Sequence, residues 1–153
     1  MSGGTEKAAP KLSREKLLAL LQTEFPEAAH AVGDYAIEEV WLGGCRVRRR
    51  HHEGSLRPGG TVSGPIMMGL ADFTMYLAVL SAIGWVPLAV TTNLTINFLK
   101  KPGGHDLLAE ARLLKLGKRL AVGEVVLRSE GDEDLVAHVT ATYSIPALGE
   151  AAR

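Results

Sequence analysis

The chain has 153 residues, 46% of them hydrophobic and 22% charged, which suits one domain with a substantial core. Its 17 basic and 17 acidic residues balance, so the net charge gives no reason to expect a nucleic-acid or anionic-membrane partner. The single cysteine, Cys45, excludes an internal disulfide and a cysteine-based metal cluster, and it is compatible with a reducing compartment.

The first ten residues contain no apolar run of the kind found in signal peptides, and we expect a disordered N-terminus in a cytoplasmic protein. Residues 11–153 are then expected to form a single domain. Ser13 can cap a first, amphipathic helix that ends at Phe25 and Pro26. The apolar face of this helix consists of Leu17, Leu18, Leu20 and Leu21.

Two strands are predicted next, at residues 35–42 and 45–52, separated by Gly43 and Gly44. The second strand places Arg46, Arg48 and Arg50 on one face, which we expect to be solvated. Residues 54–64 are rich in Gly, Pro and Ser, so we predict a loop that leads into the following apolar segment.

Asp72 is the only charged residue in the otherwise apolar stretch of residues 64–90. Roughly 20 apolar residues can cross a bilayer, but an Asp inside a span costs about 2.5 to 3.5 kcal/mol on insertion scales. Gly84 and Pro87 also interrupt the run, and no basic cluster flanks it. We therefore predict a helix buried on all sides within the protein. A carboxylate in such a setting is costly unless it has partners or a chemical role, which makes Asp72 the leading functional candidate.

The rest of the chain is predicted to be β, at residues 89–99, 107–116, 122–128 and 135–145. Residues 107–116, LLAEARLLKL, are almost all helix formers, and propensity alone would predict a helix there. A plausible tight turn at Gly117 and Lys118, β-branched residues after it and clean alternation from Leu135 to Tyr143 favour a strand in an antiparallel meander. The expected architecture is α+β, with a mostly antiparallel sheet wrapped around the long central helix.

The run SGPIMMGLAD, residues 63–72, resembles the loop-to-helix motif HGGxxxxLAD of the PaaI-like acyl-CoA thioesterases of the hotdog-fold superfamily. The later segments FLKKPGGHDLLAEARLLKLGKRLAVGEVVL and LVAHVTATYSI are similar to that family too, so the resemblance covers residues 33–145. It implies a hotdog fold with paired subunits, a homodimer or a homotetramer of two such dimers. It also implies hydrolysis of an acyl-CoA to free acid and coenzyme A, with no cofactor other than the coenzyme A of the substrate.

Thioester hydrolysis needs a group that attacks the carbonyl or activates water, and a donor that stabilises the oxyanion. Asp72 can act as nucleophile or general base, and the N–H of Gly64 near the start of the central helix can be the oxyanion donor. Eight residues separate them, about 12 Å along a helix, so they cannot serve one carbonyl within one chain. Two antiparallel helices related by a two-fold axis would bring Asp72 of one chain to Gly64 of the other. The resemblance implies the same division between subunits.

The resemblance also assigns Thr91, which aligns with a Ser or Thr that assists the water or carboxylate; Thr92 and Asn93 are its polar neighbours. The chain departs from the family motif at three positions, where Ser63 replaces His, Pro65 replaces the second Gly and Arg57 replaces a common Asn. Pro65 fits the first turn of a helix and leaves the Gly64 amide intact. Arg57 could pair with Asp72 or bind an anionic acyl group.

Further substrate contacts are predicted for basic residues that can bind the coenzyme A phosphates or simply solvate strand ends, namely Lys100, Lys101, Lys118 and Arg119. The acyl pocket is expected along the central helix, lined by Met67, Met68, Phe73 and Tyr76. No metal site is expected, because the spacing of His51, His52, His105 and His138 is not that of metal ligands.

Two alternatives accompany this hypothesis. A hydroxyacyl dehydratase of the same superfamily would use a His in the loop before the helix, where Ser55, Arg57 and Ser63 stand instead, so dehydration is disfavoured. A non-catalytic acyl-CoA-binding or regulatory hotdog domain stays open, because three motif positions are substituted. In that case Asp72 would be a structural carboxylate at a subunit interface.

Overall fold

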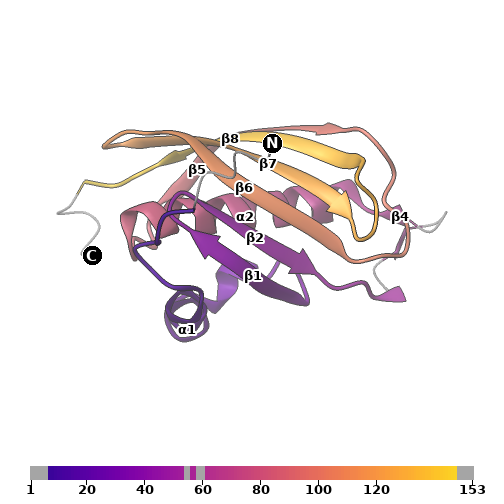
Figure 1. Ribbon diagram of the computed structural model, residues 1–153, viewed down its shortest axis with the longest axis horizontal. Helices are drawn as coiled ribbons and strands as arrows, with labels where there is room; N and C mark the ends of the chain where they lie inside the picture. Colours follow the sequence, from indigo (N-terminus) through magenta and orange to yellow (C-terminus); the bar gives the residue numbers. More distant parts are fainter. Residues whose placement is uncertain (1–6, 54–55, 58–60, 148–153) are drawn as a thin grey trace.

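The computed structural model describes residues 7–53, 56–57 and 61–147. A six-stranded antiparallel sheet curves around one long helix, α2 (Gly64–Ile83), in the strand order β1-β2-β6-β7-β8-β5. The strands are β1 (Tyr35–Trp41), β2 (Gly44–Arg49), β5 (Val90–Phe98), β6 (Leu107–Leu116), β7 (Leu120–Ser129) and β8 (Leu135–Ser144). Helix α1 (Arg14–Glu24) and the 3₁₀ turn η1 (Pro26–Ala29) lie beside β1 (Figure 1). This arrangement confirms the predicted hotdog fold.

Helix α2 begins where the sequence predicts. The Ser63 hydroxyl accepts a hydrogen bond from the Ile66 N–H, and Pro65 occupies the first turn, where its missing N–H costs nothing. The helix ends at Gly84, whose φ of +90° favours glycine. Although α2 is long and apolar enough to cross a membrane, most of it is buried inside the protein, so it is the core helix of the fold.

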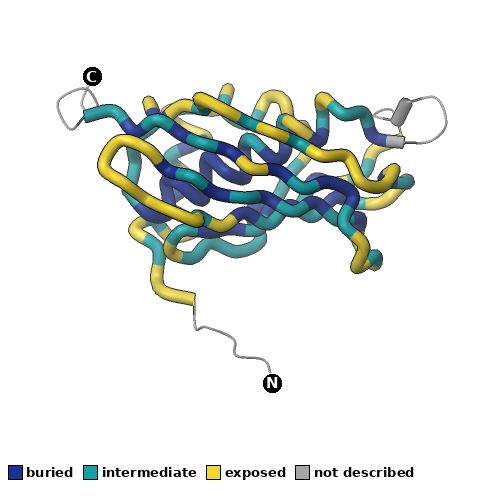
Figure 2. Tube along the Cα trace, turned by 90° about the horizontal axis from the view of Figure 1, so that it is seen from above, coloured by how far each residue is buried: buried dark blue, intermediate teal, exposed yellow. Residues whose placement is uncertain are grey.

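The sheet buries α2 through the alternating residues of its inner face. In β8 these are Ala137, Val139, Ala141 and Tyr143, and Figure 2 shows the buried positions gathered where the sheet covers the helix. Gly123 of β7 lies so close to α2 that a Cβ there would be 2.6 Å from the Cε of Met75. Cys45 of β2 is fully buried, its thiol donates to the Thr74 carbonyl of α2 (3.1 Å), and burial raises its pKa.

The structure confirms the first helix with its Ser13 cap and the strand at residues 107–116. It corrects two expectations. The loop at residues 54–64 contains the short antiparallel strands β3 (Leu56–Arg57) and β4 (Thr61–Val62). The arginine face of β2 is also ion-paired rather than simply solvated, since Arg48 contacts Glu38 (2.8 Å) and Asp106 (3.0 Å) on neighbouring segments.

Residues 7–10, which the sequence assigns to a disordered N-terminus, lie against the β1–β2 turn. Lys7 pairs with Glu39 at 3.2 Å and stacks over the ring of Trp41, and the N–H of Leu42 donates to the carbonyl of Ala8. Residues 1–6 lie outside the described part of the chain.

Candidate active site

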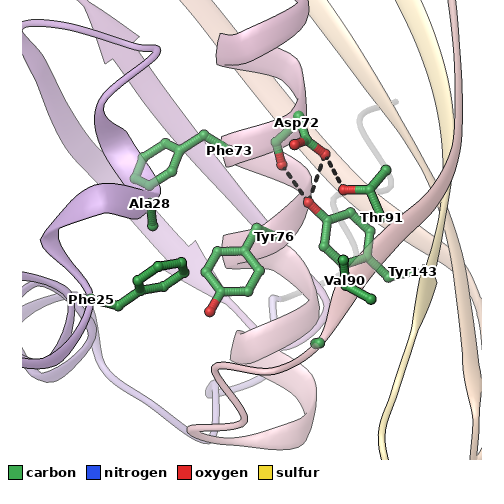
Figure 3. A pocket seen from close by; sticks show the side chains of 9 residues that line it. Phe25, Ala28, Asp72, Phe73, Tyr76, Val90, Thr91 and Tyr143 are labelled. Atoms are coloured by element: carbon green, nitrogen blue, oxygen red, sulfur yellow. Dashed lines mark hydrogen bonds between the residues drawn. The ribbon is translucent and has the colours of Figure 1, made fainter.

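Asp72 is held from two strands at the middle of α2. Its Oδ1 accepts a hydrogen bond from the Thr91 hydroxyl at 2.6 Å and another from the Tyr143 hydroxyl at 2.7 Å (Figure 3). The Tyr143 oxygen also lies 3.0 Å from the main-chain carbonyl of Asp72, so its one hydrogen has two acceptors within reach. Among the side chains that the structure describes, none donates to Oδ2. One carboxylate oxygen is therefore fixed and the other is available for chemistry.

The pairing of β5 with β8 explains why these two hydroxyls meet. Thr91 lies directly opposite Tyr143, and a β-bulge follows in which Thr92 has no partner across the strand pair. Bulges redirect side chains and are frequent beside active sites. Here the bulge lets Thr91 face α2, whereas Thr92 is exposed and its hydroxyl donates to the Thr142 carbonyl at 3.2 Å.

The electrostatic environment keeps Tyr143 protonated. Burial, and next the negative charge of Asp72, raise the pKa of this phenol, which is only 2% exposed. Burial also raises the pKa of Tyr76 to about 12, and its hydroxyl donates to the Pro87 carbonyl at 3.0 Å. Both phenols are thus hydrogen-bond donors at any physiological pH.

Asp72 stands at one end of a cavity of about 170 Å³. The lining residues are Phe25, Ala28, Asp72, Phe73, Tyr76, Ala89, Val90, Thr91 and Tyr143. Tyr76 is stacked against Tyr143 (ring centroids 6.1 Å apart) and meets Phe25 edge-on (6.2 Å). The cavity therefore has a polar end at Asp72 and aromatic walls beyond it (Figure 3).

Gly64 lies at a different cavity, of about 510 Å³, near the start of α2. Its lining residues are Val62, Gly64, Met67, Phe98, Leu99, Lys100, Lys101 and Pro102. A Cβ on Gly64 would lie 3.2 Å from the ring tip of Phe98, the last residue of β5. Among the described residues, none accepts a hydrogen bond from the Gly64 amide. The spacing of Gly64 and Asp72 along the helix predicts that they do not meet within one chain. The structure agrees, since the two residues line different cavities.

The other predicted contacts are dispersed. Thr92 and Asn93 are exposed on the edge strand β5, and Met68 is exposed outside the lining of both cavities. The Lys100 ammonium is paired with Asp132 (2.6 Å) in the β7–β8 turn.

Lys118 and Arg119 are exposed in the β6–β7 turn and line neither cavity, although the Arg119 carbonyl accepts a hydrogen bond from the N–H of Ile145, two residues after Tyr143. The backbone of Arg57 pairs with Thr61 in the short β3–β4 ladder, and the role of its side chain stays a prediction. Ser55 lies outside the described residues.

Five lining residues of the Asp72 cavity escape the sequence-based prediction, namely Phe25, Ala28, Ala89, Val90 and Tyr143. Tyr143 had a usable signal, because the alternation from Leu135 places it on the inward face, where a hydroxyl needs a partner. Phe25 and Ala28 had none, since they follow the end of the first helix and reach the cavity only through tertiary packing. In the described part of the chain, no group of three or more His, Cys, Asp or Glu side chains is placed to hold a metal ion.

Comparisons with known proteins agree with the hotdog fold. The family model of the thioesterase superfamily matches residues 59–136. A crystal structure from Silicibacter sp. TM1040, of a protein proposed to be a thioesterase, has a TM-score of 0.80 and 45% identity, covering 93% of this chain and 97% of that one. A mutant of the phenylacetic acid degradation protein PaaI from Thermus thermophilus has a TM-score of 0.67 and 26% identity, covering 77% and 97%. A proposed esterase of Saccharolobus solfataricus is 29% identical over 136 residues, 89% of this chain and 87% of that protein.

Proposed function

Because this chain belongs to the thioesterase superfamily, as a PaaI-like hotdog protein, we propose that the thioesters it hydrolyses are acyl-CoAs, with Asp72 as nucleophile or general base. The observation that carries this proposal is the setting of Asp72. Its carboxylate is fixed through one oxygen by two hydroxyls, at the polar end of a cavity that is otherwise apolar. A thioester carbonyl at that end would have its acyl group in the apolar part.

The chemistry can follow either of two balanced courses. As a general base, Oδ2 of Asp72 takes a proton from water while the water oxygen attacks the carbonyl carbon. The C–S bond then breaks, and the departing thiolate of coenzyme A takes up the proton. As a nucleophile, Oδ2 attacks the carbonyl itself, coenzyme A leaves, and water cleaves the resulting anhydride. In both courses Thr91 and Tyr143 hold Oδ1 and so orient the reacting oxygen.

The oxyanion donor in this proposal is the Gly64 amide of a second subunit. Asp72 contacts Thr91 near the start of β5, and Gly64 lies beside Phe98 at its end. If β5 pairs antiparallel with its copy, the start of one strand lies opposite the end of the other. Such pairing would therefore bring Asp72 of one chain towards Gly64 of the partner subunit, and by symmetry would create two equivalent sites.

The edge position of β5 supports this pairing. It is the last strand of the sheet, and its apolar residues Val90 and Phe98 are 57% and 51% exposed in the single chain. Exposed apolar edge strands are normally covered in natural proteins. We propose a dimer formed along β5, or a pair of such dimers, in the cytoplasm. Lys101, beside Gly64, is the best-placed of the predicted phosphate-binding residues.

Release of free thiol from a panel of acyl-CoAs tests the proposal. The wild type should release coenzyme A, and Asp72→Asn should lose at least about a hundredfold in kcat/KM, within the usual range for removing a general base. Glu133→Gln is the control, since Glu133 carries an exposed carboxylate in the β7–β8 turn, and it should behave as wild type. Thiol release that is weak in the wild type and unchanged in the Asp72→Asn variant would instead indicate a domain that binds acyl-CoA without catalysing its hydrolysis.

A further inference from the structure

The end of the cavity opposite Asp72 is built by a segment outside the hotdog sheet. Phe25, directly after α1, and Ala28 of η1 line that end, and Figure 3 shows them across the cavity from Asp72, Thr91 and Tyr143. Tyr76, one helical turn after Asp72 on α2, lies between the two ends. An acyl chain whose carbonyl sits at Asp72 would therefore run past Tyr76 and stop at Phe25 and Ala28.

This end wall is held in place by packing and by a backbone hydrogen bond. The ring of Phe25 packs edge-on against Tyr76, and its N–H donates to the Leu21 carbonyl at 3.0 Å. Other residues of the same segment line a second hollow, of about 320 Å³. Its lining residues are Leu21, Gln22, Pro26, Ala29, His30, Gly33 and Tyr35. Ala28 thus faces the Asp72 cavity, whereas its neighbour Ala29 faces the second hollow.

The size of the cavity limits what it can hold. Its volume of about 170 Å³ is close to that of a cavity of about 150 Å³ that binds benzene. Among its described lining residues Asp72 is the only charged one, so the acyl group should be uncharged. The volume fits a chain of about the size of a hexanoyl group or a single ring.

We propose that the segment Phe25–Ala28 is the specificity-determining wall of the acyl pocket and that it sets the longest acyl chain the enzyme accepts. The inference rests on the proposed function and deepens it. Truncating Phe25 removes an aromatic ring from the end of the pocket and so lengthens the pocket. Enlarging Ala28 fills the pocket from the same end, whereas the same change at Ala29 points into the second hollow.

The test uses acetyl-, butanoyl-, hexanoyl-, octanoyl- and decanoyl-CoA with the full chain. Thiol release gives kcat/KM for each, and calorimetric titration gives their binding in the Asp72→Asn background, where hydrolysis does not interfere. We expect the wild type to lose efficiency beyond hexanoyl-CoA, and Phe25→Ala to shift the optimum to octanoyl- or decanoyl-CoA. Ala28→Leu should weaken the binding of hexanoyl-CoA by about tenfold relative to that of butanoyl-CoA, because about two methylene groups of the acyl chain lose their burial. Ala29→Leu is the matched control and should keep the wild-type profile.

The outcomes separate the two proposals. If the wild type releases no thiol from any acyl-CoA, the proposed function fails, and the binding profiles still test the wall. If neither Phe25→Ala nor Ala28→Leu changes the chain-length profile of binding, or if no acyl-CoA binds, the proposal that Phe25–Ala28 limits the acyl chain is overturned. Should Phe25→Ala fail to fold by circular dichroism, Ala28→Leu with its Ala29→Leu control decides the question alone.

Discussion

The hydroxyl of Tyr143 lies 2.7 Å from Oδ1 of Asp72, although 71 residues separate them in the chain. Thr91 donates to the same oxygen from the neighbouring strand, at 2.6 Å. Two donors on one oxygen fix the rotation of the carboxylate and leave Oδ2 as the reacting atom in our proposal. The polar end of the cavity is thus an assembly of three side chains from one helix and two strands.

Replacing Tyr143 with Phe should lower kcat by about 10- to 100-fold with little change in KM, because a hydrogen bond to a charged group contributes about 1.5 to 3 kcal/mol. Steady-state kinetics with hexanoyl-CoA over a range of pH gives both constants. Tyr35→Phe is the matched control, because Tyr35 does not line the Asp72 cavity. A Tyr143→Phe enzyme with unchanged kcat at every pH would contradict the positioning role.

Thr91 allows a test of the hydroxyl itself. Thr91→Val removes the donor but keeps the shape, and we expect a loss of kcat of about tenfold or more. Thr91→Ser keeps the donor and should retain most of the wild-type activity. Thiol-release assays under identical conditions give kcat for both variants. Equal losses of kcat in Thr91→Ser and Thr91→Val would show that packing at this position matters rather than the hydrogen bond.

The shared site can be tested by mixing two inactive variants. Asp72→Ala and Gly64→Pro should each be inactive, since the first lacks the carboxylate and the second lacks the amide hydrogen. After subunit exchange, a mixed dimer has one site with both groups intact, so random pairing should restore about one quarter of the wild-type activity per chain. Analytical ultracentrifugation verifies that exchange has occurred. No recovery after verified exchange would place both groups in one chain or exclude the Gly64 amide from the reaction.

Gly123 should be one of the positions where even a methyl group destabilises the fold. Its Cβ would lie 2.6 Å from Cε of Met75 and 2.7 Å from the Arg112 carbonyl oxygen, and the backbone oxygen cannot move aside. We expect Gly123→Ala to lower the free energy of unfolding by about 1 to 3 kcal/mol, measured by urea denaturation. Gly103→Ala, whose Cβ would meet its nearest neighbour at 3.7 Å, should change it by less than about 0.5 kcal/mol. Similar midpoints for the two variants would contradict the close packing of β7 on α2.

Stability should fall in acid partly through Asp106. The hydrogen bond from the His51 N–H, and after it the contact with Arg48, lower the pKa of Asp106 in the folded state. The stabilisation is complete above the unfolded pKa of about 3.9. As the pH falls below that value the unfolded state binds the proton first, so the free energy of unfolding decreases until the folded pKa is passed. Asp106→Asn should flatten this slope in urea titrations below about pH 4, and parallel curves for variant and wild type would refute the assignment.

Residues 107–116 show how far local sequence alone can be used. Their helix propensity is overruled because Leu107, Ala109 and Ala111 form a buried inner face against α2, a period-two pattern that only a strand produces. The neighbouring turn and strands made this prediction possible. The N-cap at Ser13 and the contact of Thr91 with Asp72 were equally accessible, the first from local chemistry and the second from the family resemblance.

The sequence does not predict where segments without a regular residue pattern pack in the fold. Phe25 and Ala28 reach the cavity because α1 and η1 pack beside β1, and this packing depends on contacts far apart in the chain. The ion pairs of Arg48 were also hidden, since its partners Glu38 and Asp106 lie on two segments that only the sheet register brings together. Local residue patterns predict elements well, but side-chain neighbourhoods of this kind require the assembled sheet.

The burial of Cys45 beneath α2 makes the protein's own sulfur a reporter of unfolding. A thiolate reacts with thiol reagents as the nucleophile, and in the folded chain the Cys45 sulfur is fully covered and its thiol donates a hydrogen bond to the Thr74 carbonyl. A colorimetric reagent added to a reaction mixture therefore responds to departing coenzyme A at once. It reacts with the protein only as fast as the helix separates from β2. A single trace thus records turnover first and, over a much longer time, the rate at which the fold opens.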